Sequence, residues 1–225
     1  MAHILDYPML AALRSRHSVH AVGGPKAYRY VSEISPFAAA VDDSDQALAA
    51  LADLVEPGST MVLGRVGKQP VPPGTTVEHA TTAVQMVAPV PAPPAHDFPF
   101  LELSADDGPE MFALATMTKP GPYNPRAYMF GGYIGMRHEG RLVAMAGQRL
   151  QAPGFTEVSA VCTHPDFRGR GFGSFLMCTV AARIAARDET PFLHVYADNV
   201  NAIRLYETLG FERRTEISVT MLRRA

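Results

Sequence analysis

Apolar residues recur along this chain at two spacings, and the spacing separates predicted helices from predicted strands. After Gly173 they return every fourth residue, which predicts a helix; these positions are Leu176, Val180 and Ile184. Just before it, β-branched and small apolar residues over positions 156–163 predict a strand. Pro165 and Asp166 end that strand, because proline donates no backbone hydrogen bond and aspartate favours turns. A strand, a short glycine turn and a helix therefore follow one another directly.

Both patterns return elsewhere in the chain. Amphipathic helices are predicted over three further segments, Tyr7–Ser15, Ser44–Val55 and Asp106–Met117. Further strands are predicted over Met61–Val66, Ala83–Val87, Gly132–Met136, Leu142–Leu150 and Phe192–Ala197. The third and fourth of these strands form a predicted hairpin across Glu139-Gly140, and a last helix and strand complete the chain.

Prolines gather between positions 70 and 99 and mark loops rather than regular elements. The stretch Ala88–His96 is the predicted connection between two parts of the chain. We therefore predict a smaller N-terminal α/β half over residues 1–95, which carries no chemical motif, and a second domain over residues 96–225. The order of helices and strands in the second domain predicts a mixed α/β fold.

Composition excludes several classes of protein. The net charge of −2 leaves no excess of cations for a general nucleic-acid binder, and no apolar run approaches the roughly 20 residues that span a membrane. The first residues lack a basic region followed by a long apolar segment, so export is not expected. Cys162 and Cys178 suit a reducing compartment, and we expect a cytoplasmic protein. The sequence does not decide between a monomer and a homodimer.

The glycine turn from Arg168 to Ser174 is the most informative chemical feature. A glycine turn that leads into a helix leaves backbone N–H groups pointing outward, and the positive end of the helix dipole adds to them. Such a turn holds a phosphate or pyrophosphate, to which Arg168 and Arg170 would add charged donors; the alternative is a solvated charged turn. The chain has neither the G-x-x-x-x-G-K-[ST] phosphate loop nor the G-x-G-x-x-G dinucleotide fingerprint.

Two motifs resemble those of one enzyme superfamily. The spacing R-x-x-G-x-G, formed by Arg168, Gly171 and Gly173, resembles the pyrophosphate loop of the GNAT superfamily of acyl-CoA-dependent N-acyltransferases. Downstream, the segment from Asn199 to Phe211 resembles that family's N-x-x-A-x-x-L-Y-x-x-x-G-F segment. The chain is most similar to the FR47-like, or glycine N-acyltransferase-like, subgroup.

The resemblance implies a GNAT fold over roughly residues 100–225, with a central mixed, mostly antiparallel sheet flanked by helices. Residues 96–225 would then be the catalytic N-acetyltransferase domain, and the N-terminal half could be a degenerate copy of the same fold. The implied co-substrate is acetyl-CoA, whose acetyl group passes directly to an amine acceptor.

The same resemblance assigns the cofactor-binding residues. The pantetheine arm would pair with the backbone of the long strand at Val161, Cys162 and Thr163, where a strand N–H would polarise the acyl carbonyl. The pyrophosphate would meet the turn, which comprises Arg168, Gly169, Arg170, Gly171, Phe172, Gly173 and Ser174. Asn199 either caps the following helix or contacts the cofactor, and the two roles are compatible.

Two residues are candidates for proton transfer. Tyr206 lies where the family often has a tyrosine that protonates the departing thiolate, since a phenol keeps its proton at neutral pH; the alternative is packing of helix against sheet. Glu157 lies near where several relatives place a glutamate base that acts through water. That role needs a raised pKa or a water relay, and the alternative is a charge at the sheet edge that faces solvent.

Two histidines, one cysteine and the loop after the third predicted helix are weaker candidates for a chemical role. We expect His164 and His194 to be structural and Cys162 to be a small buried residue rather than a nucleophile. No group of residues has the spacing of a metal site. The loop Thr118–Tyr128 either lines the acceptor site or is only a proline-rich turn.

Together these features predict an acyl-CoA-dependent N-acetyltransferase that acts on the primary amine of a small molecule or amino acid. A protein or peptide N-acetyltransferase and a non-catalytic acyl-CoA-binding sensor are the alternatives. An open acidic groove would favour protein tails, whereas a closed pocket would favour metabolites.

Overall fold

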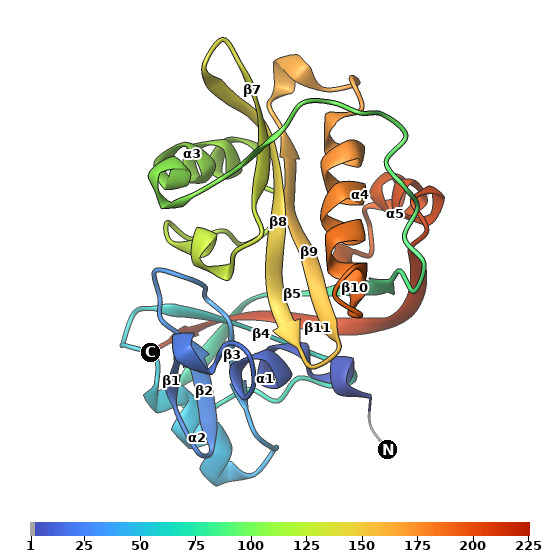
Figure 1. The fold of residues 1–225 in the computed structure, drawn as a ribbon. Helices are drawn as coiled ribbons and strands as arrows, with labels where there is room; N and C mark the ends of the chain where they lie inside the picture. The colour runs from blue at the N-terminus through green and yellow to red at the C-terminus, as the bar shows by residue number, and fades with distance from the viewer. Residues whose placement is uncertain (1–2) are drawn as a thin grey trace.

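The computed structural model describes residues 3–225, which form one large sheet, one small sheet and the helices around them (Figure 1). The α-helices are α1 Pro8–Leu13, α2 Asp45–Asp53, α3 Gly108–Thr118, α4 Phe172–Ala185 and α5 Val200–Thr208. Short 3-10 helices are Ile4–Asp6, Ser18–His20, Ala105–Asp107, Ala127–Phe130 and Pro165–Phe167. The small sheet contains β1 Ala21–Gly23, β2 Ala27–Tyr30 and β3 Ala38–Ala40. The large sheet contains β4 Thr60–Arg65, β5 Thr75–Val87, β6 Leu101–Glu102, β7 Ile134–His138, β8 Arg141–Ala152, β9 Phe155–Thr163, β10 Thr190–Tyr196 and β11 Glu212–Arg224.

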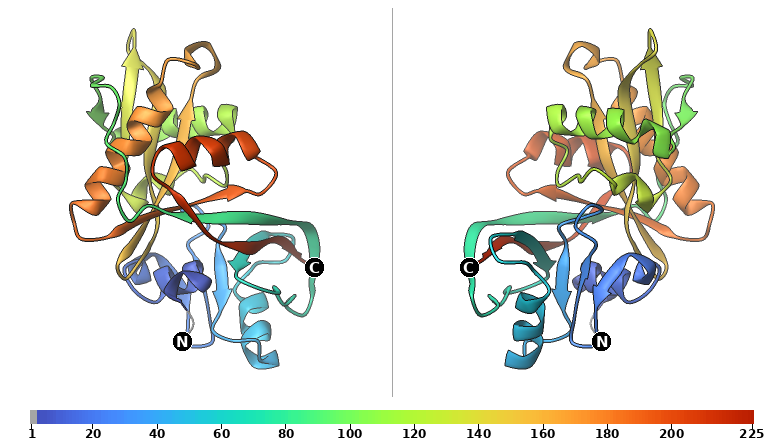
Figure 2. Two further views of the ribbon diagram at one scale, coloured as in Figure 1. Left: turned by 90° about the vertical axis from the view of Figure 1, so that its right-hand side faces the viewer. Right: turned by 90° about the vertical axis from the view of Figure 1, so that its left-hand side faces the viewer.

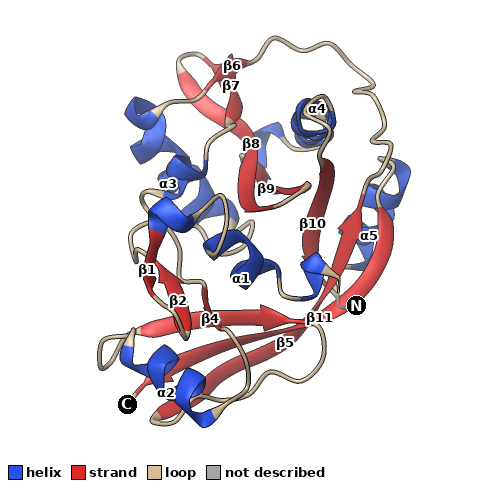
Figure 3. Ribbon diagram, turned by 60° about the horizontal axis from the view of Figure 1, so that its bottom comes forward, coloured by secondary structure: helices blue, strands red, loops and turns tan. Residues whose placement is uncertain are grey.

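The large sheet has the strand order β4-β11-β5-β10-β9-β8-β7-β6. Its neighbouring strands are antiparallel except β9 and β10, which run parallel. Figure 3 shows helices on both sides of these strands. The predicted mixed, mostly antiparallel sheet flanked by helices is therefore confirmed.

Helices cover the two faces of the sheet differently. α4 packs on one face of β8 and β9, and α1 and α3 pack on the other (Figure 1). The predicted apolar stripe of α4 is fully buried at Leu176, Val180 and Ile184. Burial of each such side chain contributes roughly 1.5–3 kcal/mol, so this face holds α4 in place. Within residues 3–225, no helix combines the length and the apolar character needed to cross a membrane.

The two halves of the chain share the large sheet. β5 comes from the N-terminal half but lies between β10 and β11, and β4 lies beyond β11. Figure 2 shows β5 and β11 as two long strands side by side, and their pairing runs from Thr75↔Arg224 to Val87↔Glu212. The predicted boundary near residue 95 thus divides the chain but not the sheet. The N-terminal half adds a three-stranded sheet of its own, which does not repeat the eight-stranded arrangement.

β5 is much longer than the predicted strand Ala83–Val87. The part before Ala83 is mostly exposed and polar, so no apolar alternation marks it. It is nevertheless a strand because β11 pairs with it along its whole length, and a ladder is formed by backbone groups rather than by side chains.

The proline-rich stretch after β5 runs along the outside of α5 and α4 (Figure 1). Its Phe98 ring lies 5.2 Å from that of Phe172 and 5.4 Å from that of Phe175, measured between ring centroids. The segment just after the predicted linker is therefore packed beside the start of α4, and His96 at the end of the linker lies next to Gly171.

The predicted hairpin between β7 and β8 is confirmed. Its turn residues Glu139 and Gly140 have φ of 49° and 80°, two successive left-handed conformations of the kind that suit the twist of a tight hairpin.

Candidate active site

β9 and β10 pair at one end and then part. The pairing covers Phe155–Glu157 of β9 and Thr190–Phe192 of β10. β9 continues along β8 to Thr163, so beyond Glu157 its other edge has no strand partner within the described residues 3–225. An unpaired strand edge presents N–H and C=O groups that an extended ligand can join.

A bulge bends β9 just after it leaves β10. The ladder between β8 and β9 takes up an extra residue on β9 at Ala160, whose φ is 53°. Bulges of this kind increase the local bend and redirect side chains. Beyond the bulge, Val161 Cγ1 and Thr163 Oγ1 lie 3.8 and 3.5 Å from the point where a Cβ on Gly173 would sit. The end of β9 therefore touches the start of α4.

The turn between β9 and α4 leaves a row of backbone N–H groups free. Gly169 and Gly171 have φ of 75° and 82°, a conformation that glycine adopts without steric cost. α4 begins at Phe172, with Gly171 at its N-cap and no side chain capping it. In the described part of the chain, none of the N–H groups from Gly169 to Ser174 donates to a protein acceptor. Free N–H groups at a helix N-terminus form a site for an anion.

Two exposed arginines flank this turn. Neither Arg168 nor Arg170 forms an ion pair with an acidic side chain among residues 3–225. The Arg170 guanidinium lies over the Phe167 ring, 4.8 Å from its centroid. Their positive charges are therefore available to an anionic ligand.

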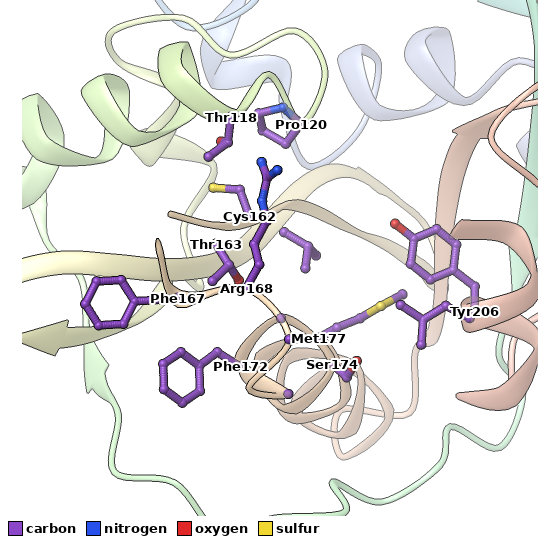
Figure 4. Close-up of a pocket in the computed structure, with 15 residues that line it drawn as sticks. Thr118, Pro120, Cys162, Thr163, Phe167, Arg168, Phe172, Ser174, Met177 and Tyr206 are labelled. Carbon is purple, nitrogen blue, oxygen red and sulfur yellow. The ribbon is translucent and has the colours of Figure 1, made fainter. Parts of the chain in front are cut away.

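A cavity of about 430 Å³ lies between the end of β9, the turn and α5 (Figure 4). Its lining includes these predicted site residues: Val161, Cys162, Thr163, Arg168, Gly169, Gly171, Phe172, Gly173, Ser174 and Tyr206. Three other predicted residues, Glu157, Arg170 and Asn199, are not part of the lining. The volume is in the range of sites that bind small molecules and cofactors.

Tyr206 packs against its own half of the protein and also lines the cavity, so its position is compatible with both roles that the sequence left open. Its ring packs near Phe211, with 6.3 Å between centroids, and also projects from α5 toward the cavity (Figure 4). Burial raises the pKa of Tyr206, which keeps the phenol protonated at neutral pH.

Asn199 caps α5. Its side-chain oxygen accepts a hydrogen bond from Ala202 N at 3.2 Å. The capping role predicted from the sequence is therefore confirmed, and the contact to a cofactor stays a prediction.

Glu157 does not face solvent, although the alternative to a base role predicted that it would. It is completely buried, not exposed at a sheet edge. Its carboxylate accepts four hydrogen bonds, from Arg149 Nε (2.8 Å), Arg149 Nη2 (2.6 Å), His194 Nδ1 (2.7 Å) and Leu150 N (3.2 Å). Burial alone would raise its pKa, but Arg149 and His194 outweigh burial and hold the pKa of Glu157 far below its usual range. The raised pKa is thus absent, and the water relay stays a prediction.

Both His164 and His194 form hydrogen-bond contacts with other side chains of the protein. His194 contacts Glu157 through Nδ1 and Gln85 through Nε2, at 2.9 Å. His164 is buried and contacts the Arg141 side chain. Cys162 is buried as well, and burial raises the pKa of its thiol to about 11. Such a thiol is a poor nucleophile, which agrees with the prediction from the sequence.

Three residues that sequence reasoning did not select also line the cavity: Phe167, Met177 and Leu205. Met177 follows Gly173 by one helical turn, so the spacing on α4 could have found it. Leu205 lies on α5 one residue before Tyr206. Nothing in the sequence indicated that Phe167 lines the cavity, because its position depends on the geometry of the turn.

The loop after α3 reaches the cavity only at its beginning. Thr118 and Pro120 line the cavity, whereas Lys119, Tyr123 and Arg126 do not. Further along, the loop packs against the N-terminal half, where Arg126 N donates to Glu33 O at 2.9 Å. Within residues 3–225, no cluster of His, Cys, Asp or Glu is arranged to hold a metal ion.

A family model described as FR47-like protein matches residues 133–219. A GNAT-family crystal structure from Novosphingobium aromaticivorans DSM 12444 is 40% identical, covers 100% of both chains and has a TM-score of 0.92. A GCN5-related N-acetyltransferase from Kribbella flavida is 18% identical over 96% of this chain and 94% of that chain, with a TM-score of 0.62; that similarity concerns the fold alone.

Curated proteins match a shorter part of the chain. A mycothiol acetyltransferase of Brachybacterium faecium is 38% identical over 85 residues, which are 35% of this chain and 25% of that protein. The N-alpha-acetyltransferase RimI of Mycobacterium tuberculosis is 38% identical over 84 residues, which are 36% of this chain and 52% of that protein. The similarity is thus confined to about a third of this chain and to about half or less of these relatives.

Proposed function

Because this chain belongs to the GNAT family of acetyltransferases, we propose that it transfers the acetyl group of acetyl-CoA to the primary amine of a small molecule. The observation that supports this most directly is the row of free N–H groups from Gly169 to Ser174, beside a cavity that also contains Tyr206.

The turn suits the diphosphate of acetyl-CoA. Several backbone N–H groups converge there, the helix dipole is positive at that end, and Arg168 has no acidic partner within residues 3–225. Hydrogen bonds to a charged group contribute about 1.5–3 kcal/mol each, so a few of them anchor the cofactor. Arg170 lies outside the cavity lining and would act only through its charge.

The free edge of β9 suits the pantetheine arm. Val161–Thr163 lines the cavity on the side where β9 has left β10. An arm that carries amide groups can pair with this edge as an added strand. The thioester carbonyl would then lie near a strand N–H, which stabilises the negative charge that develops on its oxygen.

Tyr206 is the proposed general acid. In the transfer, the amine nitrogen bonds to the acetyl carbon and the bond from that carbon to the CoA sulfur breaks. The departing thiolate takes a proton from the Tyr206 hydroxyl, which projects into the same cavity. The raised pKa of Tyr206 ensures that this proton is present at neutral pH. The amine nitrogen gives up one proton to solvent as the amide forms, and the Tyr206 phenolate regains one from solvent.

Glu157 is proposed as a positioning residue rather than as the base. A carboxylate offers about four acceptor positions, and all four donors are already in place on Glu157. It therefore has no free position from which to take the proton of an amine. Its bonds to residues of β8 and β10 instead hold the three strands at the point where β9 and β10 part.

The lining of the cavity favours a small acceptor over a basic protein tail. Among the described residues that line it there is no Asp or Glu, so nothing there attracts a run of lysines. The similarity to RimI, named as an N-alpha-acetyltransferase, keeps a peptide N-terminus as the second candidate acceptor.

Purified protein tests the proposal. Calorimetry with acetyl-CoA measures binding, and a thiol-release assay over a panel of amines and short peptides, read together with product masses, measures transfer. Acetylated small amines support the proposal, and acetylated peptides alone would support the second candidate. Binding of acetyl-CoA without thiol release on any acceptor would instead identify a sensor.

A further inference from the structure

A second cavity, of about 370 Å³, lies where the small sheet meets β4, β11 and the loop after α3. Its walls include Arg29 and Tyr30 of β2, Phe37 just before β3, Met61 of β4 and Asn124 of the loop. It shares no lining residue with the first cavity. It is therefore a separate site, built largely by the N-terminal half for which the sequence offered no chemistry.

Arg29 is the unusual residue of this cavity. It is half-buried, and within residues 3–225 its side chain forms neither an ion pair nor a hydrogen bond. Its Nε atom is fully buried and has no partner. Buried N–H groups are nearly always hydrogen-bonded, and a guanidinium stays charged at every physiological pH. Arg29 thus has one unsatisfied donor inside the protein, at Nε, and brings an uncompensated positive charge to the cavity wall.

The other arginine that lines this cavity, Arg223, already has an acidic partner. The Arg223 side chain contacts the Glu78 carboxylate through Nε and donates to Gly58 O through Nη1 at 2.5 Å. No Asp, Glu or Lys is among the described residues that line the cavity. One positive charge, that of Arg29, is therefore left without a counter-charge.

Hydroxyl groups complete the walls. Ser35, Ser59 and Thr60 line the cavity. The Ser35 oxygen accepts from Phe37 N at 3.3 Å, which leaves the Ser35 O–H free to donate. Tyr30, Phe37 and Met61 are also among the lining residues, but their side chains are almost completely buried in the core. The cavity therefore suits a ligand with one anionic group and a small hydroxylated remainder.

We propose that this second cavity binds a small organic carboxylate, with the carboxylate on Arg29 and its remainder beside the hydroxyl groups of Ser35 and Ser59. The planar guanidinium matches the two oxygens of a carboxylate. A single uncompensated charge also favours a carboxylate over a phosphate monoester, which carries about −1.5 to −2 at neutral pH.

An occupant of this site would also contact the loop that lines the candidate active site at its other end. Asn124 Nδ2 donates to Ser32 O at 2.5 Å, which ties the loop to the small sheet at the cavity wall. Thr118 and Pro120, a few residues earlier, line the first cavity. The proposed ligand is therefore placed to restrain one end of that loop.

Calorimetry and thermal unfolding test the proposal with acetate, lactate and benzoate as probes, and with inorganic phosphate and methylammonium as charge controls. At least one carboxylate is expected to bind saturably, to raise the Tm, and to stay bound when acetyl-CoA saturates the first cavity. Arg29→Gln should raise its Kd about tenfold or more, since a charge-assisted bond is lost. Arg14→Gln is the matched control, because Arg14 is exposed, lies outside the cavity and also forms no ion pair within residues 3–225, and it should leave the Kd unchanged.

Ser59→Ala is a second variant that keeps Arg29, and it tests carboxylate binding in the second cavity if Arg29→Gln does not fold. Loss of one neutral hydrogen bond should raise the Kd about twofold to tenfold. The proposal is overturned if no carboxylate binds saturably, if phosphate binds more tightly than every carboxylate, or if acetyl-CoA displaces the probe. An unchanged Kd in both Arg29→Gln and Ser59→Ala would overturn it as well.

Discussion

Arg149 of β8 and Glu157 of β9 form a buried bidentate ion pair. Arg149 Nε lies 2.8 Å from Glu157 Oε2, and Arg149 Nη2 lies 2.6 Å from Glu157 Oε1. The Glu157 side chain is 0% exposed and that of Arg149 is 13% exposed. Glu157 is also the last residue of β9 that pairs with β10. The ion pair therefore fixes the place where the sheet opens toward the cavity, and His194 extends it to β10.

Glu157→Gln should destabilise the protein strongly. The substitution leaves the Arg149 guanidinium buried without its counter-charge, and loss of one partner of a buried ion pair costs about 3–5 kcal/mol. Urea unfolding of the wild type and the variant measures this difference. The matched control is Glu102→Gln, because Glu102 forms an exposed pair with Arg183 and should cost at most about 1 kcal/mol. An equal loss in the free energy of unfolding for the two variants would show that the buried pair stabilises the protein no more than the exposed pair.

The same pair predicts a dependence of stability on pH. Burial alone would raise the pKa of Glu157, but Arg149 and His194 lower it overall. A carboxyl with a lower pKa in the folded state stabilises the protein above its unfolded pKa of about 4.3 and loses that contribution as the pH falls further. We therefore expect the free energy of unfolding to decrease below about pH 4.3, and less steeply in Glu157→Gln. Urea unfolding at several acidic pH values checks this; parallel curves for both proteins would contradict it.

Gly171→Val should abolish binding of acetyl-CoA. Gly171 has φ of 82°, and a Cβ there would lie 3.4 Å from His96 Cδ2, beside the free N–H groups of the turn. Valine would therefore strain the turn and press against His96 and Phe98, which shifts the backbone N–H groups that face the diphosphate. Calorimetry with acetyl-CoA measures the loss.

Gly154→Val is the control for backbone strain. Gly154 has a similar φ of 76° and open space around its Cβ position, and it lies in the turn between β8 and β9, outside the lining of the cavity. This variant should lose stability but keep its affinity for acetyl-CoA. If both glycine variants bind acetyl-CoA like the wild type, the turn does not hold the cofactor.

Tyr206→Phe should slow turnover without changing the affinity for acetyl-CoA. The ring that packs near Phe211 remains, and only the hydroxyl that protonates the thiolate is lost. General acids contribute about 100- to 10,000-fold, so kcat should fall within that range while the Kd for acetyl-CoA stays constant. Tyr128→Phe, outside the cavity lining, is the control. An unchanged kcat in Tyr206→Phe would assign the proton to another donor.

The part of the site that could be predicted from the sequence is local. The glycines, the start of α4 and the position of Tyr206 follow from residues close together in the chain, and the cavity brings them together as expected. The Arg149–Glu157 pair could not be found this way, because it depends on which residues of β8 and β9 face each other. That register is irregular beside the pair, where the ladder shifts between Gln148 and Gln151.

In the fold, too, features with a local sequence pattern were predicted and features that depend on distant partners were not. The strands with apolar patterns were found, whereas the first part of β5 was missed because its side chains are polar and exposed. Its place between β10 and β11 depends on a partner that is more than a hundred residues away in the chain. The second cavity likewise arises where three distant segments meet, so Arg29 carried no signal in the sequence.

A crystal structure with bound acetyl-CoA would show where the diphosphate of the cofactor lies. We expect the diphosphate within hydrogen-bonding distance of the backbone N–H groups between Gly169 and Ser174, and the thioester near Tyr206. A diphosphate bound elsewhere, with those N–H groups still facing solvent, would contradict it.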